Sequence, residues 1–222
     1  MKHINVPFTA AVRSDSPMED IASFLSTIER HDIAIAPWPL PGKKPQVQFA
    51  IAHTGDAILL RYTVAEEYVR AVNKESNDPV YEDSCVEFFI SPDNNSGYYN
   101  FEFNSLEACL MGYGNDLNTR EYQPPALISK IRRKAVTINE HADNGLIPWE
   151  LTLVFPLEVF AHHTIATLTG RECTANFYKC GDKLPHPHYL AWNNIETPQP
   201  DFHRPEFFGR LIFQPEAAKI NN

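Results

Sequence analysis

Carboxylate and amide side chains gather in two neighbouring stretches of the sequence. Glu87 lies in the first stretch, and Asn100, Glu102 and Asn104 lie in the second. Alternate residues of a β-strand share one face of the sheet, so each stretch would present its polar groups on one face. Carboxylates accept hydrogen bonds, and amides both donate and accept them. A row of such groups therefore suits a ligand rich in hydroxyl groups.

Two aromatic residues are candidates for a flat apolar platform beside these polar groups. Tyr81 precedes the first stretch, and Trp192 is followed directly by two asparagines. An apolar platform with a few fixed polar groups is the general composition of small-molecule sites. Half of any solvent-facing strand is polar, however, and tryptophan often belongs to the core, so the residues alone leave both interpretations open. The candidate binding residues are two aromatic and four polar side chains: Tyr81, Trp192, Glu87, Asn100, Glu102 and Asn193.

A β-hairpin would hold the two polar stretches side by side. Apolar residues alternate along both predicted strands, Cys85–Ser91 and Tyr98–Asn104, and a turn-forming segment rich in Asn and Gly joins them. Register is set by the need to place both apolar faces in the core. That register would bring Glu87 onto the same sheet face as Glu102.

The remaining pattern predicts a mainly β protein with one short helix. A helix is predicted over about residues 17–30, with Ser16 as its cap, Pro17 in its first turn and Glu19 as the capping-box partner. Further strands are predicted at 46–52, 57–64, 126–131, 135–139, 149–155, 174–179 and 208–213. Many short strands with frequent turn signals favour an antiparallel, jelly-roll-like β-sandwich. No long linker divides the chain, so we expect one domain over residues 1–222.

Composition excludes several classes of function. The chain has 19 basic and 28 acidic residues, a net charge of −9, which disfavours nucleic acid as a partner. It has no apolar stretch near the roughly 20 residues of a membrane helix, so no membrane partner is expected. The first residues lack the apolar core of a secretory signal, which predicts a cytoplasmic protein, or a periplasmic or secreted one if a leader was trimmed. The oligomeric state stays open.

Several segments together resemble family 9 carbohydrate-binding modules. The segment Val80–Ile90, VYEDSCVEFFI, is similar to that family's (W/Y)-x-D-x-x-V-E-x-F signature. Further similar segments follow in the expected order: YYNFEFN at 98–104, WELTLVFPL at 149–157, ANFYK at 175–179, AW at 191–192 and DFHRPEFFGRL at 201–211. The resemblance covers about residues 30–215.

The resemblance implies a β-sandwich that binds a sugar without cleaving it. It assigns the two stacking positions to Tyr81 and Trp192 and the hydrogen-bonding acid to Glu87. It further implies a mono- or oligosaccharide partner and a link to polysaccharide or oligosaccharide breakdown. No catalytic residue and no cofactor follow from it, although relatives often carry structural calcium. Asp93, Asn94, Asn95 and Asp56 offer oxygen ligands for calcium, but their spacing matches no EF-type loop and is typical of ordinary turns.

A glycoside hydrolase is the alternative function. Glu87 and Glu102 on neighbouring strands form the type of carboxyl pair that flanks a glycosidic bond in such enzymes. A general acid needs a pKa raised by burial, and an open sheet face would not supply it. The sequence therefore favours a binding protein over an enzyme.

Histidines and cysteines are further candidate metal ligands in this sequence. His186 and His188 flank a proline and would form a zinc or nickel site only if Asp182 or His203 joined them. The four cysteines contain no C-x-x-C pair, and Cys85 lies in an apolar strand, which predicts a buried thiol. The sequence thus predicts no metal site, and it leaves the disulfide state of Cys85, Cys109, Cys173 and Cys180 open.

Overall fold

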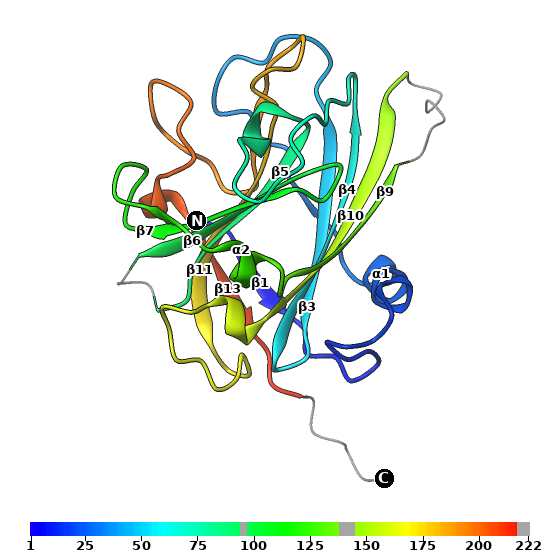
Figure 1. The fold of residues 1–222 in the computed structure, drawn as a ribbon, viewed down its shortest axis with the longest axis vertical. Helices are drawn as coiled ribbons and strands as arrows, with labels where there is room; N and C mark the ends of the chain where they lie inside the picture. The colour runs from blue at the N-terminus through cyan, green and yellow to red at the C-terminus, as the bar shows by residue number, and fades with distance from the viewer. Residues whose placement is uncertain (94–96, 138–144, 217–222) are drawn as a thin grey trace.

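Two β-sheets pack face to face in the computed structural model, which describes residues 1–93, 97–137 and 145–216 (Figure 1). The first sheet has the order β1 (His3–Val6), β13 (Gly209–Phe213), β11 (Glu172–Cys180), β5 (Cys85–Ser91), β6 (Tyr98–Asn104), β7 (Cys109–Gly114) and β8 (Glu121–Tyr122), with β12 (Tyr189–Ala191) also paired to β11. The second has the order β2 (His31–Asp32), β3 (Gln46–His53), β4 (Ala57–Glu66), β10 (Ile147–Pro156) and β9 (Arg132–Thr137).

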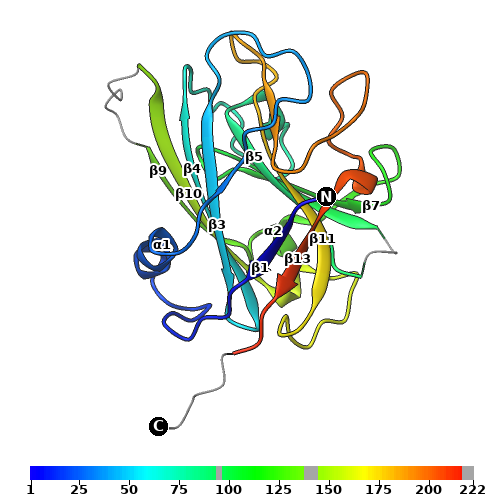
Figure 2. The ribbon, with the colours of Figure 1, turned by 180° about the vertical axis from the view of Figure 1, so that it is seen from behind.

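The predicted antiparallel sandwich is confirmed, with one parallel addition at an edge. Strand β1 pairs in parallel with β13 at the edge of the first sheet, and Figure 2 shows the two side by side. The other named strands of the described ranges pair antiparallel. The predicted hairpin of β5 and β6 forms with the expected bounds, because its alternating pattern is unambiguous.

Helix α1 (Met18–Ser26) covers the outer face of the second sheet (Figure 2). Ile21 and Leu25 are its buried residues, which fits the predicted apolar stripe. The helix is shorter than predicted, and Ser16 does not cap it. The Ser16 hydroxyl instead accepts a hydrogen bond from the backbone N–H of Arg13 at 2.9 Å, and Pro17 occupies the N-cap position without a side-chain bond.

The prediction of a strand at 126–131 is wrong, because the chain forms helix α2 (Pro125–Ile128) there. Two consecutive prolines begin this turn, and the N–H of Ser129 donates to the carbonyl of Pro125 at 2.9 Å. Three 3₁₀ turns complete the helical elements of the described residues: η1 (Val80–Glu82), η2 (Leu157–Val159) and η3 (Pro205–Phe207). The strand predicted at 135–139 is β9, and residues 138 and 139 lie outside the described ranges. None of the described helices has the length and apolar character to cross a bilayer.

Aromatic side chains fill the space between the two sheets. Phe177 of β11 stacks on Phe49 of β3 with ring centroids 3.8 Å apart, and on its neighbour Phe88 of β5 at 5.0 Å. Phe88 belongs to the predicted apolar face of β5, and that whole face enters this core. The polar face of β5 and β6 therefore points away from the second sheet, as the alternation predicts.

A buried ion pair also joins the two sheets. The Lys179 ammonium on β11 lies 2.9 Å from the Glu66 carboxylate on β4, and neither side chain is exposed. The indole N–H of Trp149 donates to the second Glu66 oxygen at 2.7 Å. His188 Nε2 accepts from Lys179 at 3.0 Å, and its pKa is lowered to about 3 by burial and by the Lys179 charge, so its ring is neutral. Each charge thus lies beside an opposite charge, as burial requires.

Removing one member of this pair should destabilise the protein strongly. Lys179→Ala would leave the Glu66 charge buried without its cation, and we expect the free energy of unfolding to fall by about 3–5 kcal/mol. Urea unfolding followed by tryptophan fluorescence measures this change. Lys183→Ala is the matched control, because Lys183 is 59% exposed in its ion pair with Glu82 and should cost less than about 1 kcal/mol. Equal effects of the two variants would contradict the structural role of the buried pair.

Candidate ligand-binding site

A cavity of about 300 Å³ opens on the face of the first sheet that points away from the second. Its volume lies at the lower end of the range for small-molecule sites. It has a floor of carboxyl and thiol groups from the strands and walls of aromatic and charged side chains from loops. Twelve residues line it: Tyr81, Glu87, Glu102, Leu117, Arg120, Cys180, Asp182, Tyr189, Pro200, Asp201, Phe202 and His203.

Two carboxyl groups form the centre of the floor. The β5–β6 register places Glu87 directly opposite Glu102, as the sequence predicted. One Glu102 oxygen accepts from the Asn100 amide at 2.8 Å and lies 3.3 Å from Arg120 Nη1. The other oxygen, Oε2, is buried and has no hydrogen-bond partner within the described part of the chain. A ligand hydroxyl is the type of group that would satisfy it.

Burial changes the ionisation of Glu87. Its pKa is raised well above the ordinary value, first because the side chain is buried and then because the Glu102 charge lies nearby. The Cys180 thiol donates to its Oε1 at 3.0 Å. We expected an open sheet face that would leave carboxyl pKa values unshifted, and this expectation was wrong. Loops around residues 81, 120 and 202 cover that face, and the protonated Glu87 can donate as well as accept hydrogen bonds.

Arg120 is the cation of the pocket and is held from two sides. Its Nη1 group donates to Nε2 of His203 at 2.8 Å and contacts Glu102. A guanidinium has only donors, so Nε2 of His203 must be the accepting nitrogen and Nδ1 carries the ring proton. His203 Nδ1 therefore donates to the Tyr98 hydroxyl oxygen, which lies 2.8 Å away. Burial and the Arg120 charge lower the pKa of His203 to about 3, which agrees with a neutral ring.

Aromatic side chains form the walls. Tyr81 lies in η1 rather than on β5, because the strand begins only at Cys85. Tyr189 lies in β12, and the ring of Trp38 packs edge-on against it with centroids 6.1 Å apart. Phe202 stacks on Tyr178 at 4.1 Å, so one of its ring faces is covered. Tyr81 and Tyr189 are only partly buried and are the rings that remain accessible to a ligand.

Trp192 does not line this pocket, contrary to the role the sequence suggested. The side chain is 3% exposed and packs between the sheets, edge-on against Phe49 and Phe177. Gly209 makes room for it, since a Cβ there would lie 2.4 Å from its ring. The reason is strand alternation: Leu190 and Trp192 point into the core, whereas Tyr189 points to the pocket side.

The two candidate asparagines also act through the protein itself. Asn193 lies outside the pocket lining, and its amide donates to the Phe207 carbonyl at 2.7 Å and accepts from the Lys2 N–H at 2.9 Å. Asn100 is fully buried and reaches the pocket only through its bond to Glu102. Asn193 therefore anchors chain segments, and Asn100 positions the Glu102 carboxylate.

Other polar residues of the two strands serve the fold. Asp83 Oδ2 accepts from the backbone N–H groups of Val72 and Asn73 and from the Asn104 amide, at 2.9–3.1 Å. Asn104 in turn accepts through Oδ1 from the N–H groups of Leu106 and Ala108. These bonds tie the loop before β5 to the turn after β6. Within the signature segment, Asp83 is structural and Glu87 is the acid that faces the pocket.

Sequence reasoning missed several wall residues, among them Arg120, Tyr189, Phe202 and His203. Arg120 lies in a loop without a periodic pattern, so no local signal identifies it. Tyr189 did carry a signal, because it lies three residues before Trp192 and an odd separation on a strand reverses the face. Phe202 and His203 lie within the DFHRPEF segment, which belongs to the family resemblance.

The histidine metal site considered from sequence does not form. His186 Nδ1 lies 2.8 Å from Glu67, and His188 contacts Lys179, so neither joins Asp182 or His203. Of the oxygen ligands considered for calcium, Asp56 accepts hydrogen bonds from the hydroxyls of Ser14 and Thr54. Asp93 lies 3.5 Å from His163 Nε2. Asn94 and Asn95 lie outside the described residues.

A two-sheet sandwich with an aromatic-walled pocket on one sheet face is the architecture of a small-molecule-binding domain. A comparison with protein-family models matches residues 20–213 to carbohydrate-binding family 9, and the chain belongs to this family. Non-catalytic carbohydrate binding, which the sequence predicted, is the class of function that this membership supports. A search of curated proteins gave no match.

Solved structures agree with this assignment. The chain is similar to a proposed carbohydrate-binding protein from Bacteroides uniformis ATCC 8492, with 38% identity, a TM-score of 0.88, and 96% of this chain and 99% of that chain covered. Two structures of family 9 modules from Caldicellulosiruptor kristjanssonii, one solved with cellotriose and one with glucose, show 11% and 14% identity and TM-scores of 0.65 and 0.58. The matched regions cover 99% and 100% of this chain and 97% and 100% of the two module chains. At these identities the two structures show the shared fold alone.

The raised pKa of Glu87 predicts how stability depends on pH. Above pH 4.5, the ordinary glutamate pKa, Glu87 loses its proton in the unfolded protein but keeps it in the folded protein. The free energy of unfolding should therefore fall as pH rises toward the pKa of Glu87 in the folded state. Glu87→Gln removes this titration, and the variant should gain stability relative to wild type between pH 4.5 and neutral pH. Urea unfolding at a series of pH values measures the difference. Glu29→Gln, at an 83% exposed side chain, should follow wild type; parallel curves for Glu87→Gln and wild type would rule out the raised pKa.

The position of Trp192 predicts a loss of stability on truncation. Trp192→Ala should lower the free energy of unfolding by about 3–5 kcal/mol, because it leaves a cavity between the sheets. Thermal or urea denaturation measures this. Tyr68→Ala removes a 40% exposed ring and should change stability little. A Trp192→Ala protein as stable as wild type would show that the indole does not belong to the core.

Proposed function

We propose that this chain binds the terminal unit or units of a sugar in the pocket formed by β5, β6 and the covering loops. One observation carries the proposal: an unpartnered, buried carboxylate oxygen of Glu102 belongs to the same pocket that the accessible rings of Tyr81 and Tyr189 line. Sugars combine apolar ring faces with many hydroxyl groups. A site for them therefore needs both stacking surfaces and buried hydrogen-bonding groups.

Each pocket residue has a role in this proposal. Tyr81 and Tyr189 provide the stacking faces, and Tyr189 replaces Trp192 as the second aromatic side chain. Glu87 and Glu102 bind hydroxyl groups, with Glu102 fixed in place by Asn100 and Arg120. A cavity of about 300 Å³ suits a monosaccharide, a disaccharide or the end of a longer chain. The family 9 structures solved with glucose and with cellotriose support this class of ligand.

The family relationship further supports a role in polysaccharide or oligosaccharide breakdown, in which this chain holds a sugar rather than cleaving it. The buried Glu87 has the raised pKa that a general acid would need. The same property also serves binding, because a protonated carboxyl group donates a hydrogen bond to a sugar oxygen. Family membership favours binding over hydrolysis.

Isothermal titration with mono- and oligosaccharides, including glucose and cello-oligosaccharides, tests the proposal. Wild type should bind at least one sugar, and Tyr81→Ala and Tyr189→Ala should each lower affinity about tenfold or more, the loss typical of a central aromatic contact. Tyr68→Ala, an exposed tyrosine outside the pocket, should bind as wild type does. Undiminished binding in both pocket variants would place the sugar elsewhere.

Product analysis distinguishes binding from hydrolysis. Prolonged incubation of wild type with each bound oligosaccharide should yield no shorter sugars by chromatography. Products that form with wild type and disappear with Glu87→Gln would instead establish the hydrolase alternative.

A further inference from the structure

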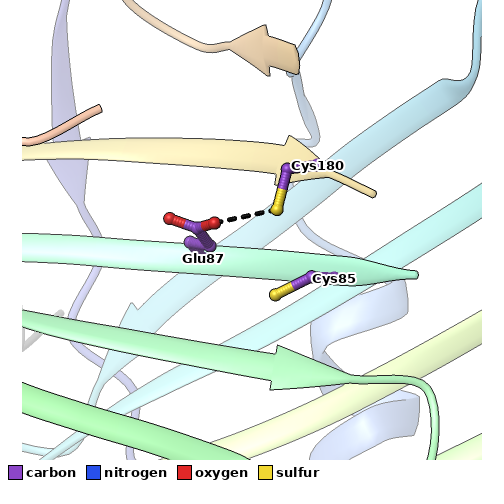
Figure 3. A group of neighbouring side chains, drawn as sticks. All are labelled: Cys85, Glu87 and Cys180. Carbon is purple, nitrogen blue, oxygen red and sulfur yellow. Dashed lines mark hydrogen bonds between the residues drawn. The ribbon is translucent and has the colours of Figure 1, made fainter. Parts of the chain in front are cut away.

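We propose that Cys85, Glu87 and Cys180 form a binding site for a thiophilic divalent cation of the zinc type on the floor of the pocket. The two sulfur atoms and a carboxylate oxygen all lie within 4.8 Å of one another (Figure 3). Within the described ranges, this is the one group of three such ligands that are this close together. Figure 3 shows the Glu87 carboxyl group and the Cys180 sulfur pointing toward each other between β5 and β11.

The strands bring the three ligands together through their register. Cys85 of β5 lies directly opposite Cys180 of β11. Glu87 is two residues after Cys85 and therefore projects from the same face. Because both strands are interior strands of the first sheet, the ligands stand on a rigid support, which is the arrangement a metal site needs.

The spacing fits a tetrahedral ion with small side-chain adjustments. Zinc bonds of about 2.3 Å to sulfur and 2.1 Å to oxygen place two sulfurs about 3.8 Å apart and a sulfur and an oxygen about 3.6 Å apart. Cys180 Sγ now lies 3.0 Å from Glu87 Oε1, so the ion would replace this hydrogen bond and separate the two atoms slightly. Two thiolates with one carboxylate form a donor set that favours zinc over calcium or magnesium.

The pocket supplies the remaining coordination position and the entry path. Glu87 and Cys180 both line the cavity, so an ion can arrive from solvent and keep a fourth position open to water or a ligand. Each thiol and the protonated Glu87 carboxyl group would release its proton to solvent as the metal binds. Since Glu87 also contacts the proposed sugar, ion and sugar binding should influence each other, but the metal site stands independently of the sugar.

The other two cysteines provide matched controls. Cys109 and Cys173 are buried as well, but they belong to the cluster between the two sheets, on the opposite face of the first sheet. Cys85 and Cys180 belong to the cluster on the pocket side. A Cys→Ser change at residue 173 thus tests the general effect of losing a buried thiol without touching the proposed site.

Titration of the reduced protein with Co²⁺ tests the site, followed by displacement with Zn²⁺. Wild type should bind about one equivalent, with the intense visible absorption of tetrahedral cobalt and a thiolate charge-transfer band. Cys180→Ser and Cys85→Ser should each lose most of that band and at least tenfold in affinity. Cys173→Ser should retain both, and Glu87→Gln, which keeps both thiols, should keep a weaker-binding site with an altered spectrum.

Several results would overturn the proposal. Folded wild-type protein without a thiolate band would do so, as would a band that persists in Cys85→Ser and Cys180→Ser. Equal loss of the thiolate band and of cobalt affinity in Cys173→Ser would indicate general destabilisation instead of a site. Circular dichroism of each variant establishes that it is folded. The readout is independent of sugar binding, so a failure of the sugar proposal would leave this result interpretable.

Discussion

The alternation of side chains along β5 and β6 is the constraint on which the rest of the structure depends. Both strands are buried on both faces, with aromatic rings toward the second sheet and carboxyl groups toward the pocket. A shift of one residue would place Glu87 among the phenylalanines of the core and turn Phe88 toward the pocket side. The same register that builds the core therefore positions the binding floor.

Burying acidic groups on this floor requires compensation, and neighbouring side chains from strands and one loop supply it. Arg120 and Asn100 support Glu102, while Glu87 is held by the Cys180 thiol and by retention of its proton. The resulting pocket has donors and acceptors fixed before a ligand arrives. Such preorganisation lowers the ordering cost of binding. The fixed carboxyl and thiol groups also explain why a sugar and a thiophilic cation are both chemically suited to one small cavity.

The alternating strands were predictable because their apolar periodicity is set by the chain itself. The bounds of β5 and β6 and the pairing of Glu87 with Glu102 follow from that pattern. The helical turn in segment 126–131 was not predictable, because an apolar run after two prolines is compatible with a strand or a helical turn. Trp192 was assigned to the pocket because its ring suits stacking, whereas its strand neighbours determine which face it occupies.

The sequence by itself determined the family, the sandwich class and the acidic face of the central hairpin, because period-two patterning and the ordered motifs are local properties of the chain. Only the tertiary structure decided which aromatic rings flank that face, that Arg120 and His203 reach it, and that Cys85 and Cys180 meet beside Glu87. These contacts join segments far apart in the chain. Their geometry depends on how loops close over a finished sheet, which no local pattern encodes.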